Sequence, residues 1–361
     1  MATWSKIKQS TDSGAIVEMQ APVIVSASRS TDIPAFYADW FFYRLQKGYS
    51  AWTNPFNGVK SYISYDKTRF IVFWSKNPRP LLPYLHVLQE RNIGCYIQYT
   101  LNDYEKEHLE KVPPLSARID TFKQLVEHLG KGAVVWRFDP MILTDKISVN
   151  DLIDKVGNIA EQLKGYTEKL VFSFADIASY RKVKLNLEKN NINYIEWNEI
   201  LMNEFALKLS EMNRECDWNY QLATCGEKID IEQYGIVHNH CIDDVPMIRF
   251  AYHDKELMDF LKVDIRRIQP LSLSLFDEFD NRSIIPADSI MITPEIYAIK
   301  RKNNKDNGQR QFCGCMVSKD IGQYNTCPHL CEYCYANTNK VVAVANWNRH
   351  KLNPKGESII G

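Results

Sequence analysis

Short, continuously apolar runs alternate with amphipathic stretches through residues 1–270 of the chain. The runs are rich in Val, Ile, Phe, Tyr and Trp, as strands buried on both faces of a sheet are. They span residues 23–28, 49–54, 70–75, 95–100, 133–138, 169–174 and 218–224. Intervening stretches with helical spacing of apolar positions span residues 35–47, 80–92, 116–130, 149–165 and 196–216. This alternation predicts an α/β fold with parallel strands. Six to eight such units favour a (β/α) TIM-like barrel over the alternative, a doubly wound sheet.

Polar side chains follow these runs repeatedly, and several occur as pairs of opposite charge. Arg29 and Asp32 follow the first run, Arg137 lies at the end of the run at 133–138, and Asp139 directly follows that run. In a parallel barrel such residues gather at the C-terminal face, where active sites lie. We therefore take Arg137, Asp139 and Asp32 as catalytic candidates. The alternative is that Arg29–Asp32 and Arg137–Asp139 are salt bridges that stabilise the rim of the barrel.

Composition and charge narrow the class of protein. The 361 residues are 45% hydrophobic and 24% charged, which is typical of a globular protein. The net charge of zero argues against an overall basic nucleic-acid binder, but it does not bear on a local basic groove. The N-terminus lacks the form of a signal peptide, and no apolar run approaches the ~18 residues that span a bilayer. We expect a cytoplasmic protein without a membrane partner.

The nine cysteines divide into three sets. Cys95 and Cys216 are expected to be buried as small hydrophobic side chains. Four more make a complete set for a zinc site or a second, fully ligated iron–sulfur cluster: Cys225, Cys241, Cys313 and Cys315. The alternatives are that the C-x-C pair at 313–315 uses His238 or His240, that the other two are free thiols, or that one of them returns a hydrogen atom to a product radical.

The third set is a local triplet, Cys327, Cys331 and Cys334, with the spacing C-x3-C-x2-C. Three thiolates on one loop can hold three corners of a [4Fe–4S] cluster and leave its fourth iron open. Residues 320–327 are predicted as a strand before this loop, and residues 335–350 as a helix after it. We divide the chain into a barrel at 1–270 and a cysteine-rich cluster-binding segment at 271–361, packed on the barrel mouth.

The triplet, with the aromatic Tyr333 before its third cysteine, resembles the signature of the radical S-adenosylmethionine (SAM) superfamily. The trailing YCYAN resembles the spore photoproduct lyase branch. The chain is also similar, from about Val23 to Asn337, to a family catalogued as domain of unknown function 1848. The matching blocks are SASRSTDIPAFYADWF, WTNPFN, IVFWSKNP, VVWRFDPMILTD, QLATCGE, GCMVSKDIGQYNTC and CPHLCEYCYAN.

The resemblance implies an enzyme that uses a [4Fe–4S] cluster and SAM to generate a 5′-deoxyadenosyl radical, with an external electron donor of flavodoxin or ferredoxin type. It makes Arg29, Arg137, Asp139 and Tyr333 candidates for holding the cofactor. Most relatives carry the cluster loop near the N-terminus, so its position here implies a permuted barrel. No Gly-Gly-Glu segment that would hold the SAM amino group is present.

The substrate is not predicted beyond a hint of nucleic acid or nucleotide, with lyase or nucleic-acid repair or modification chemistry. Tryptophans that could form a base-stacking platform are Trp4, Trp40, Trp52, Trp74 and Trp136. The alternative is a barrel stabilised by zinc or iron–sulfur that binds nucleic acid or transfers electrons without cleaving SAM. In the zinc version, His329 would be the fourth ligand of the triplet. The sequence gives no oligomeric state.

Overall fold

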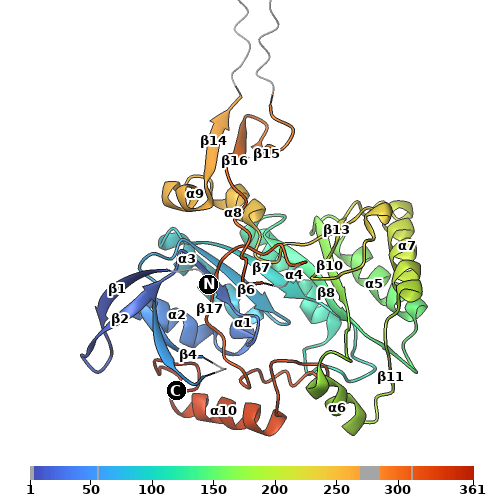
Figure 1. The fold of residues 1–361 in the computed structure, drawn as a ribbon, viewed down its shortest axis with the longest axis horizontal. Coiled ribbons are helices and arrows are strands. Elements are labelled where there is room, and N and C mark those ends of the chain that lie inside the picture. Colours follow the sequence, from blue (N-terminus) through green and yellow to red (C-terminus); the bar gives the residue numbers. More distant parts are fainter. Residues whose placement is uncertain (1–3, 55–56, 269–284, 310–311) are drawn as a thin grey trace, which may run out of the picture.

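The computed structural model describes residues 4–54, 57–268, 285–309 and 312–361. Within them the largest sheet has eight strands, all parallel, in the order β13-β12-β10-β8-β7-β6-β3-β17 (Figure 1). These strands are β3 (Ile24–Ala27), β6 (Phe70–Ser75), β7 (Gly94–Thr100), β8 (Val134–Met141), β10 (Lys169–Phe174), β12 (Gln221–Thr224), β13 (Ile236–His238) and β17 (Lys319–Asp320). The predicted α/β fold with parallel strands is therefore confirmed.

The closed barrel is not shown. From β3 to β13 the strands follow one another in chain order, as in a (β/α) barrel, and β17 is added beside β3. The two edge strands β13 and β17 do not pair with each other in the described part of the chain. A doubly wound sheet reverses its strand order at an internal strand, and no such reversal occurs between β3 and β13. The sheet thus has barrel order with one open seam.

Helices follow most strands of this sheet. They are α1 (Ile33–Phe36), α2 (Ala38–Lys47), the 3-10 helix η1 (Arg79–Tyr84), α3 (Leu85–Glu90), α4 (Leu115–Leu129), α5 (Val149–Leu163), α6 (Arg181–Lys189) and α7 (Glu199–Glu215). The start of α5 shows why they form: Ser148 accepts a hydrogen bond from the backbone of Asp151, whose side chain accepts one from the backbone of Ser148. Apolar side chains then recur at helical spacing and are buried, as at Leu152, Val156 and Ile159.

The two faces of the sheet pack into different cores because successive side chains of a strand point to opposite faces. On β6, Ile71 and Phe73 enter the larger core, which the helices listed above cover. Phe70 and Val72 enter a second core, which contains residues of α8 (Asp244–Ala251) and α9 (Lys255–Leu261) together with buried cysteines. Both faces of the sheet are thereby covered, as the continuously apolar runs predict.

One predicted strand belongs to a different sheet. The run at 49–54 forms β4 (Tyr49–Thr53), which pairs antiparallel with β5 (Lys60–Ser64) in the order β1-β2-β5-β4, together with β1 (Ser5–Ser10) and β2 (Ile16–Ala21). Residues 54–59 are too few for a crossover to a parallel neighbour, which needs a dozen or more residues. The run is therefore a strand, but its assignment to the parallel sheet is wrong.

Smaller units complete the chain. β9 (Leu143–Thr144) pairs with β11 (Tyr194–Ile195), and η2 (Glu232–Tyr234) precedes β13. β14 (Val263–Arg267), β16 (Ile296–Lys300) and β15 (Ile290–Thr293) form an antiparallel sheet in the order β14-β16-β15, in the unit that projects at the top of Figure 1. The proposed domain boundary at 270/271 lies outside the described residues.

The C-terminal segment packs against the start of the chain. After the cysteine triplet, α10 (Lys340–Leu352) places Trp347 edge-on to Phe36 and Tyr37, with ring centroids 5.7 and 5.2 Å apart. Beyond α10, the Gly356 carbonyl accepts a 2.9 Å hydrogen bond from Trp40 Nε1. The predicted helix at 335–350 thus forms about five residues later. The predicted strand at 320–327 is confined to its first residue, because β17 ends at Asp320.

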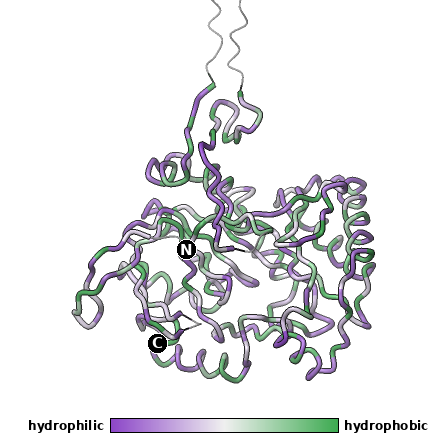
Figure 2. The backbone as a smooth tube through the Cα atoms, in the orientation of Figure 1, coloured by the Kyte–Doolittle hydropathy of each residue, from purple (hydrophilic) through white to green (hydrophobic). Residues whose placement is uncertain are grey.

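Hydrophobic stretches run through the central body of the molecule, and the projecting unit around β14 mixes hydrophilic and hydrophobic stretches (Figure 2). Among the described residues, no helix combines the length and the apolarity that crossing a membrane would require.

Candidate functional site

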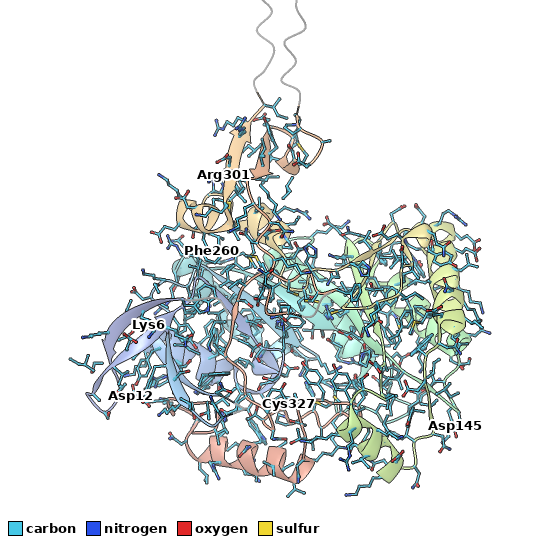
Figure 3. All side chains as sticks on the ribbon, viewed as in Figure 1. Lys6, Asp12, Asp145, Phe260, Arg301 and Cys327 are labelled. Atoms are coloured by element: carbon cyan, nitrogen blue, oxygen red, sulfur yellow. The ribbon has the colours of Figure 1, made fainter. Side chains whose placement is uncertain are left out.

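The cysteine triplet lies on the loop between β17 and α10. Parallel pairing of β17 with β3 brings this loop beside the residues that follow β3, nearly 300 positions earlier in the chain. Thr31 joins the two loops: its hydroxyl lies 2.8 Å from the Gln323 carbonyl and 2.7 Å from the Thr326 hydroxyl. Gly322 is required at this junction, because a Cβ there would lie 1.7 Å from Ser28 Oγ. Cys327 is labelled in Figure 3, above α10.

The three thiols are withdrawn from water and close enough to influence one another. Cys331 is 6% exposed, and Cys327 and Cys334 are partly buried. Burial raises the pKa of all three thiols, that of Cys327 to about 12, and the negative charge of the neighbouring thiolates contributes to the rise at Cys327 and Cys331. The Asn337 backbone N–H donates to Cys334 Sγ over 3.3 Å. Such N–H donors to sulfur tune iron–sulfur clusters where one is bound.

His329, between the first two cysteines of the triplet, is fully engaged. Its Nδ1 lies 2.8 Å from the Lys111 carbonyl and its Nε2 2.8 Å from a carboxylate oxygen of Asp32. The same carboxylate accepts hydrogen bonds from Ser75 Oγ (2.6 Å) and from the backbone of Lys76 (2.7 Å). Burial opposes charge on Asp32, but the contact with His329 outweighs it and lowers the pKa of the carboxyl. Asp32 therefore joins the ends of β3 and β6 to the cysteine loop.

A second buried charge pair lies beside the triplet. Lys76 Nζ is 2.8 Å from Glu110 Oε1 and 2.9 Å from the Tyr333 hydroxyl, which itself donates to Glu110. Asn102 Nδ2 donates to the same carboxylate oxygen over 2.9 Å. Burial alone would lower the pKa of Lys76, but the Glu110 carboxylate and the Cys331 thiol outweigh it, so its pKa is raised and the amine stays charged. Lys76 is thus a buried cation next to Cys331.

These contacts assign Tyr333 a place in a hydrogen-bond network and reveal one functional candidate that the sequence did not indicate. Lys76 and Asn102 follow strands and could be expected at this edge of the sheet. Glu110 lies ten residues after β7, in no motif, and becomes visible only through its contacts.

The two arginine candidates lie beside the other cysteine group. The Arg29 and Arg137 guanidinium carbons lie 5.5 and 5.2 Å from the ring centroid of Trp74. Arg137 is 1% exposed, pairs with Asp139 and donates to Cys241 Sγ over 3.1 Å. One nitrogen of Arg29, Nη2, is buried and finds no hydrogen-bond partner in the described part of the chain. The Arg137–Asp139 salt bridge anticipated as the alternative is thus present, whereas Asp32 pairs with His329 rather than with Arg29.

The structure also places the remaining candidates, the four cysteines outside the triplet. Cys225 Sγ lies 3.1 Å from Cys241 Sγ, and Cys315 Sγ lies 3.4 Å from the backbone N–H of Ile242, which follows Cys241. Hydrogen bonding with Cys315 lowers the pKa of the Cys313 thiol to about 6. Among the described residues, no three His, Cys, Asp or Glu side chains are already arranged to hold a metal ion. Thiols in direct contact are closer together than thiolates around a metal, since Zn–S bonds of about 2.3 Å imply tetrahedral S–S distances of about 3.8 Å.

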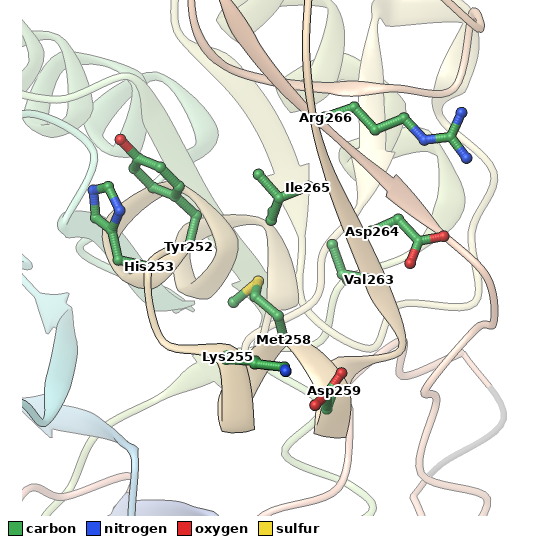
Figure 4. Close-up of a pocket in the computed structure, with 9 residues that line it drawn as sticks. All are labelled: Tyr252, His253, Lys255, Met258, Asp259, Val263, Asp264, Ile265 and Arg266. Carbon is green, nitrogen blue, oxygen red and sulfur yellow. The ribbon is translucent and has the colours of Figure 1, made fainter.

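Three other expectations can be compared with the structure. Cys95 is buried as expected, but Cys216 is exposed, because it ends α7 at the surface. Trp40 and Trp136 are fully buried and cannot stack on bases. A groove of about 600 Å³ is lined by residues of α9 and β14 together with Tyr252 and His253 (Figure 4). It contains none of the cysteines or charged pairs described above, so we do not place the functional site there.

Comparison with known proteins gives a family but no activity. Neither a curated protein nor a solved structure matches the chain. The family model described as "Domain of unknown function (DUF1848)" matches residues 24–336, which include both cysteine groups and all the charged residues discussed above. The chain belongs to the DUF1848 family.

Proposed function

We propose that this protein is a radical SAM-type iron–sulfur enzyme in which Cys327, Cys331 and Cys334 hold a [4Fe–4S] cluster. The observation that carries the proposal is the combination of three buried or partly buried thiols on one loop with a candidate fourth ligand, His329, whose two ring nitrogens are both engaged. A cluster with three protein ligands keeps one iron open, and SAM bound there supplies a 5′-deoxyadenosyl radical. The same engagement of His329 argues against a four-ligand zinc site at the triplet.

The charged side chains around the triplet support this proposal, but the role of facing the cofactor passes from the two arginines to a lysine. Arg29 and Arg137 were expected to hold the cofactor, but both contact Trp74 and lie by the four-cysteine group. Lys76 is a largely buried cation that contacts the triplet loop through the Tyr333 hydroxyl. We assign to Lys76 the charge that would face the SAM carboxylate, with Glu110 and Tyr333 fixing its position. Asp32 is assigned as a positioning residue, since all its described contacts lie within the protein.

The proposed reaction needs two partners that are separate from the chain, an electron donor and a substrate. Reduction of the cluster would require an external donor of flavodoxin or ferredoxin type. The substrate class suggested by the resemblance is nucleic acid or nucleotide, for lyase or repair or modification chemistry. Asp139 is the candidate catalytic group, because it lies near the carboxyl end of β8 and pairs with Arg137, and its negative charge contributes to the raised pKa of Lys76.

The test is reconstitution of the full chain with iron and sulfide in the absence of oxygen. About four irons per triplet are expected, with release of 5′-deoxyadenosine from SAM after reduction, and Cys331→Ala should abolish both. Cys216→Ala is the matched control, because this exposed thiol belongs to neither group. Zinc alone, without SAM cleavage, would overturn the proposal.

The second candidate function is a metal-stabilised protein that binds nucleic acid or transfers electrons without cleaving SAM. The observation that favours it is the engagement of both candidate SAM-binding arginines at the four-cysteine group. A reconstituted cluster that undergoes reversible one-electron reduction but leaves SAM intact would support this function instead.

A further inference from the structure

Four cysteines meet where the parallel sheet is open. Cys225 directly follows β12, and Cys241 lies three residues after β13, one edge strand. Cys313 and Cys315 lie on the segment that leads into β17, the other edge strand. Backbone hydrogen bonding already joins the two edges here, since the Met316 N–H donates to the Ile242 carbonyl over 3.0 Å. The cysteine group therefore spans the seam that no strand pairing closes in the described residues.

The compactness of the group favours one ion over a cluster. Cys225 and Cys241 are in contact at 3.1 Å, and Cys315 Sγ lies 3.4 Å from the backbone N–H of Ile242, the residue after Cys241. Cys313 lies two residues from Cys315, on the same C-x-C turn. If the distance between neighbouring sulfurs widened from 3.1 Å to about 3.8 Å, the four sulfurs could surround one tetrahedral ion. A [4Fe–4S] cluster would need a larger separation, because each cysteine binds a different iron at a different corner.

The surroundings supply N–H donors to the sulfurs, as the outer shell of a thiolate site does. The backbone N–H of Ile242 points to Cys315 Sγ over 3.4 Å. Cys241 Sγ accepts from Asn239 Nδ2 at 3.2 Å and from Arg137 Nη1 at 3.1 Å. A neutral thiol is a weak acceptor, whereas a thiolate makes full use of such donors.

Nearby positive charge and close packing of the backbone also favour a single ion bound by thiolates. A divalent ion with four thiolates carries two negative charges, and two guanidinium groups lie nearby. That of Arg137 donates to Cys241 Sγ, and that of Arg29 lies over the same Trp74 ring as Arg137. Arg137 also pairs with Asp139, whereas Arg29 Nη2 has no hydrogen-bond partner among the residues that the structure describes. Gly314 lets the C-x-C turn approach the end of β13, because a Cβ there would lie 2.0 Å from the His240 ring.

We propose that Cys225, Cys241, Cys313 and Cys315 bind a single zinc ion that ties the edge strands β13 and β17 together. The site is structural: all four ligand positions are taken by protein thiolates, and none is left for substrate. The proposal goes beyond the radical SAM assignment and does not depend on it.

The test uses the full chain purified without chelator. About one zinc per chain is expected, lost in Cys225→Ser and Cys313→Ser but retained in Cys216→Ser and in Cys331→Ala. Retention in Cys331→Ala separates this site from the triplet. Far-UV circular dichroism of each variant checks that it folds.

Cobalt titration of the metal-depleted wild-type chain makes the test independent of any variant. Intense sulfur-to-cobalt charge-transfer bands and strong visible bands of a tetrahedral tetrathiolate complex are expected at one equivalent. Asn239→Ala, which removes one N–H donor to Cys241, should weaken the metal affinity about 10-fold or more. The proposal is overturned by a weak, octahedral cobalt spectrum, by zinc content that both serine variants keep, or by a second set of iron and sulfide that Cys225→Ser removes.

Discussion

Replacing Asp32 by alanine should weaken the join between the cysteine loop and the sheet. The change removes the acceptor for His329 Nε2, Ser75 Oγ and the Lys76 backbone N–H in a fully buried site. Breaking one side of a buried ion pair costs about 3–5 kcal/mol, and each buried donor left without a partner costs about 1–3 kcal/mol. These costs are not additive, because the donors share one carboxylate. We expect a loss of about 3–5 kcal/mol in the free energy of unfolding.

Urea denaturation followed by circular dichroism measures this loss, and iron retained after anaerobic reconstitution measures its effect on the loop. Asp120→Ala is the matched control, because this aspartate is exposed on α4; it should change stability by less than about 0.5 kcal/mol. Adding His329→Ala to Asp32→Ala should cost less than the sum of the single changes, since neither partner of this contact is then left without the other. An Asp32→Ala chain as stable as the control, with unchanged iron content, would refute the reasoning.

Three further changes test other contacts. Gly322→Ala introduces a Cβ within 1.7 Å of Ser28 Oγ, and the overpacking should cost about 1–3 kcal/mol and lower iron retention, whereas unchanged unfolding would contradict the tight junction. Tyr333→Phe removes the hydroxyl from the buried lysine–glutamate network; it should leave iron content unchanged and reduce 5′-deoxyadenosine release, and equal release would remove this tyrosine from the proposed SAM site. The hydrogen bond from Arg44 lowers the pKa of Asp12 in the folded chain. The pair therefore stabilises the fold fully above the unfolded pKa of about 3.9, and this stabilisation is lost as the pH falls through the lower pKa of the folded state. The difference in free energy of unfolding between wild type and Asp12→Asn, measured by urea titration, should be largest at neutral pH and shrink in acid.

The sequence was sufficient for the regular part of the fold and insufficient where pairing depends on distant residues. Continuous apolar runs identify strands buried on both faces, and six of the seven runs lie in the parallel sheet. The seventh, β4, has the same composition, so only its short connection to β5 shows that it must pair antiparallel. β17 has two residues, Lys319 and Asp320, and no periodicity can identify so short and polar a strand.

The candidate site divides in the same way. The triplet spacing is local, so the sequence displays it directly. Arg29 and Arg137 lie over Trp74, beside one cysteine group and not the other. Local sequence patterns do not encode this contact between distant residues. Glu110 contacts Lys76 and Tyr333 across the sheet edge, and nothing in its neighbourhood in the sequence distinguishes it from a solvated glutamate.

The position of β17 links the two cysteine groups. Cys315 lies four residues before this strand and Cys327 seven residues after it, so one short strand separates the proposed zinc site from the proposed cluster loop. The carboxyl ends of parallel neighbours emerge on the same side of a sheet, which is why a loop near the C-terminus faces Asp32 and Lys76. A two-residue strand has too few backbone hydrogen bonds to hold that position alone. Asp320 adds side-chain bonds to Ser26 and Ser28, 3.0 and 2.8 Å long. An ion that fixes the segment before β17 would hold the strand from its other end, and thereby position the triplet.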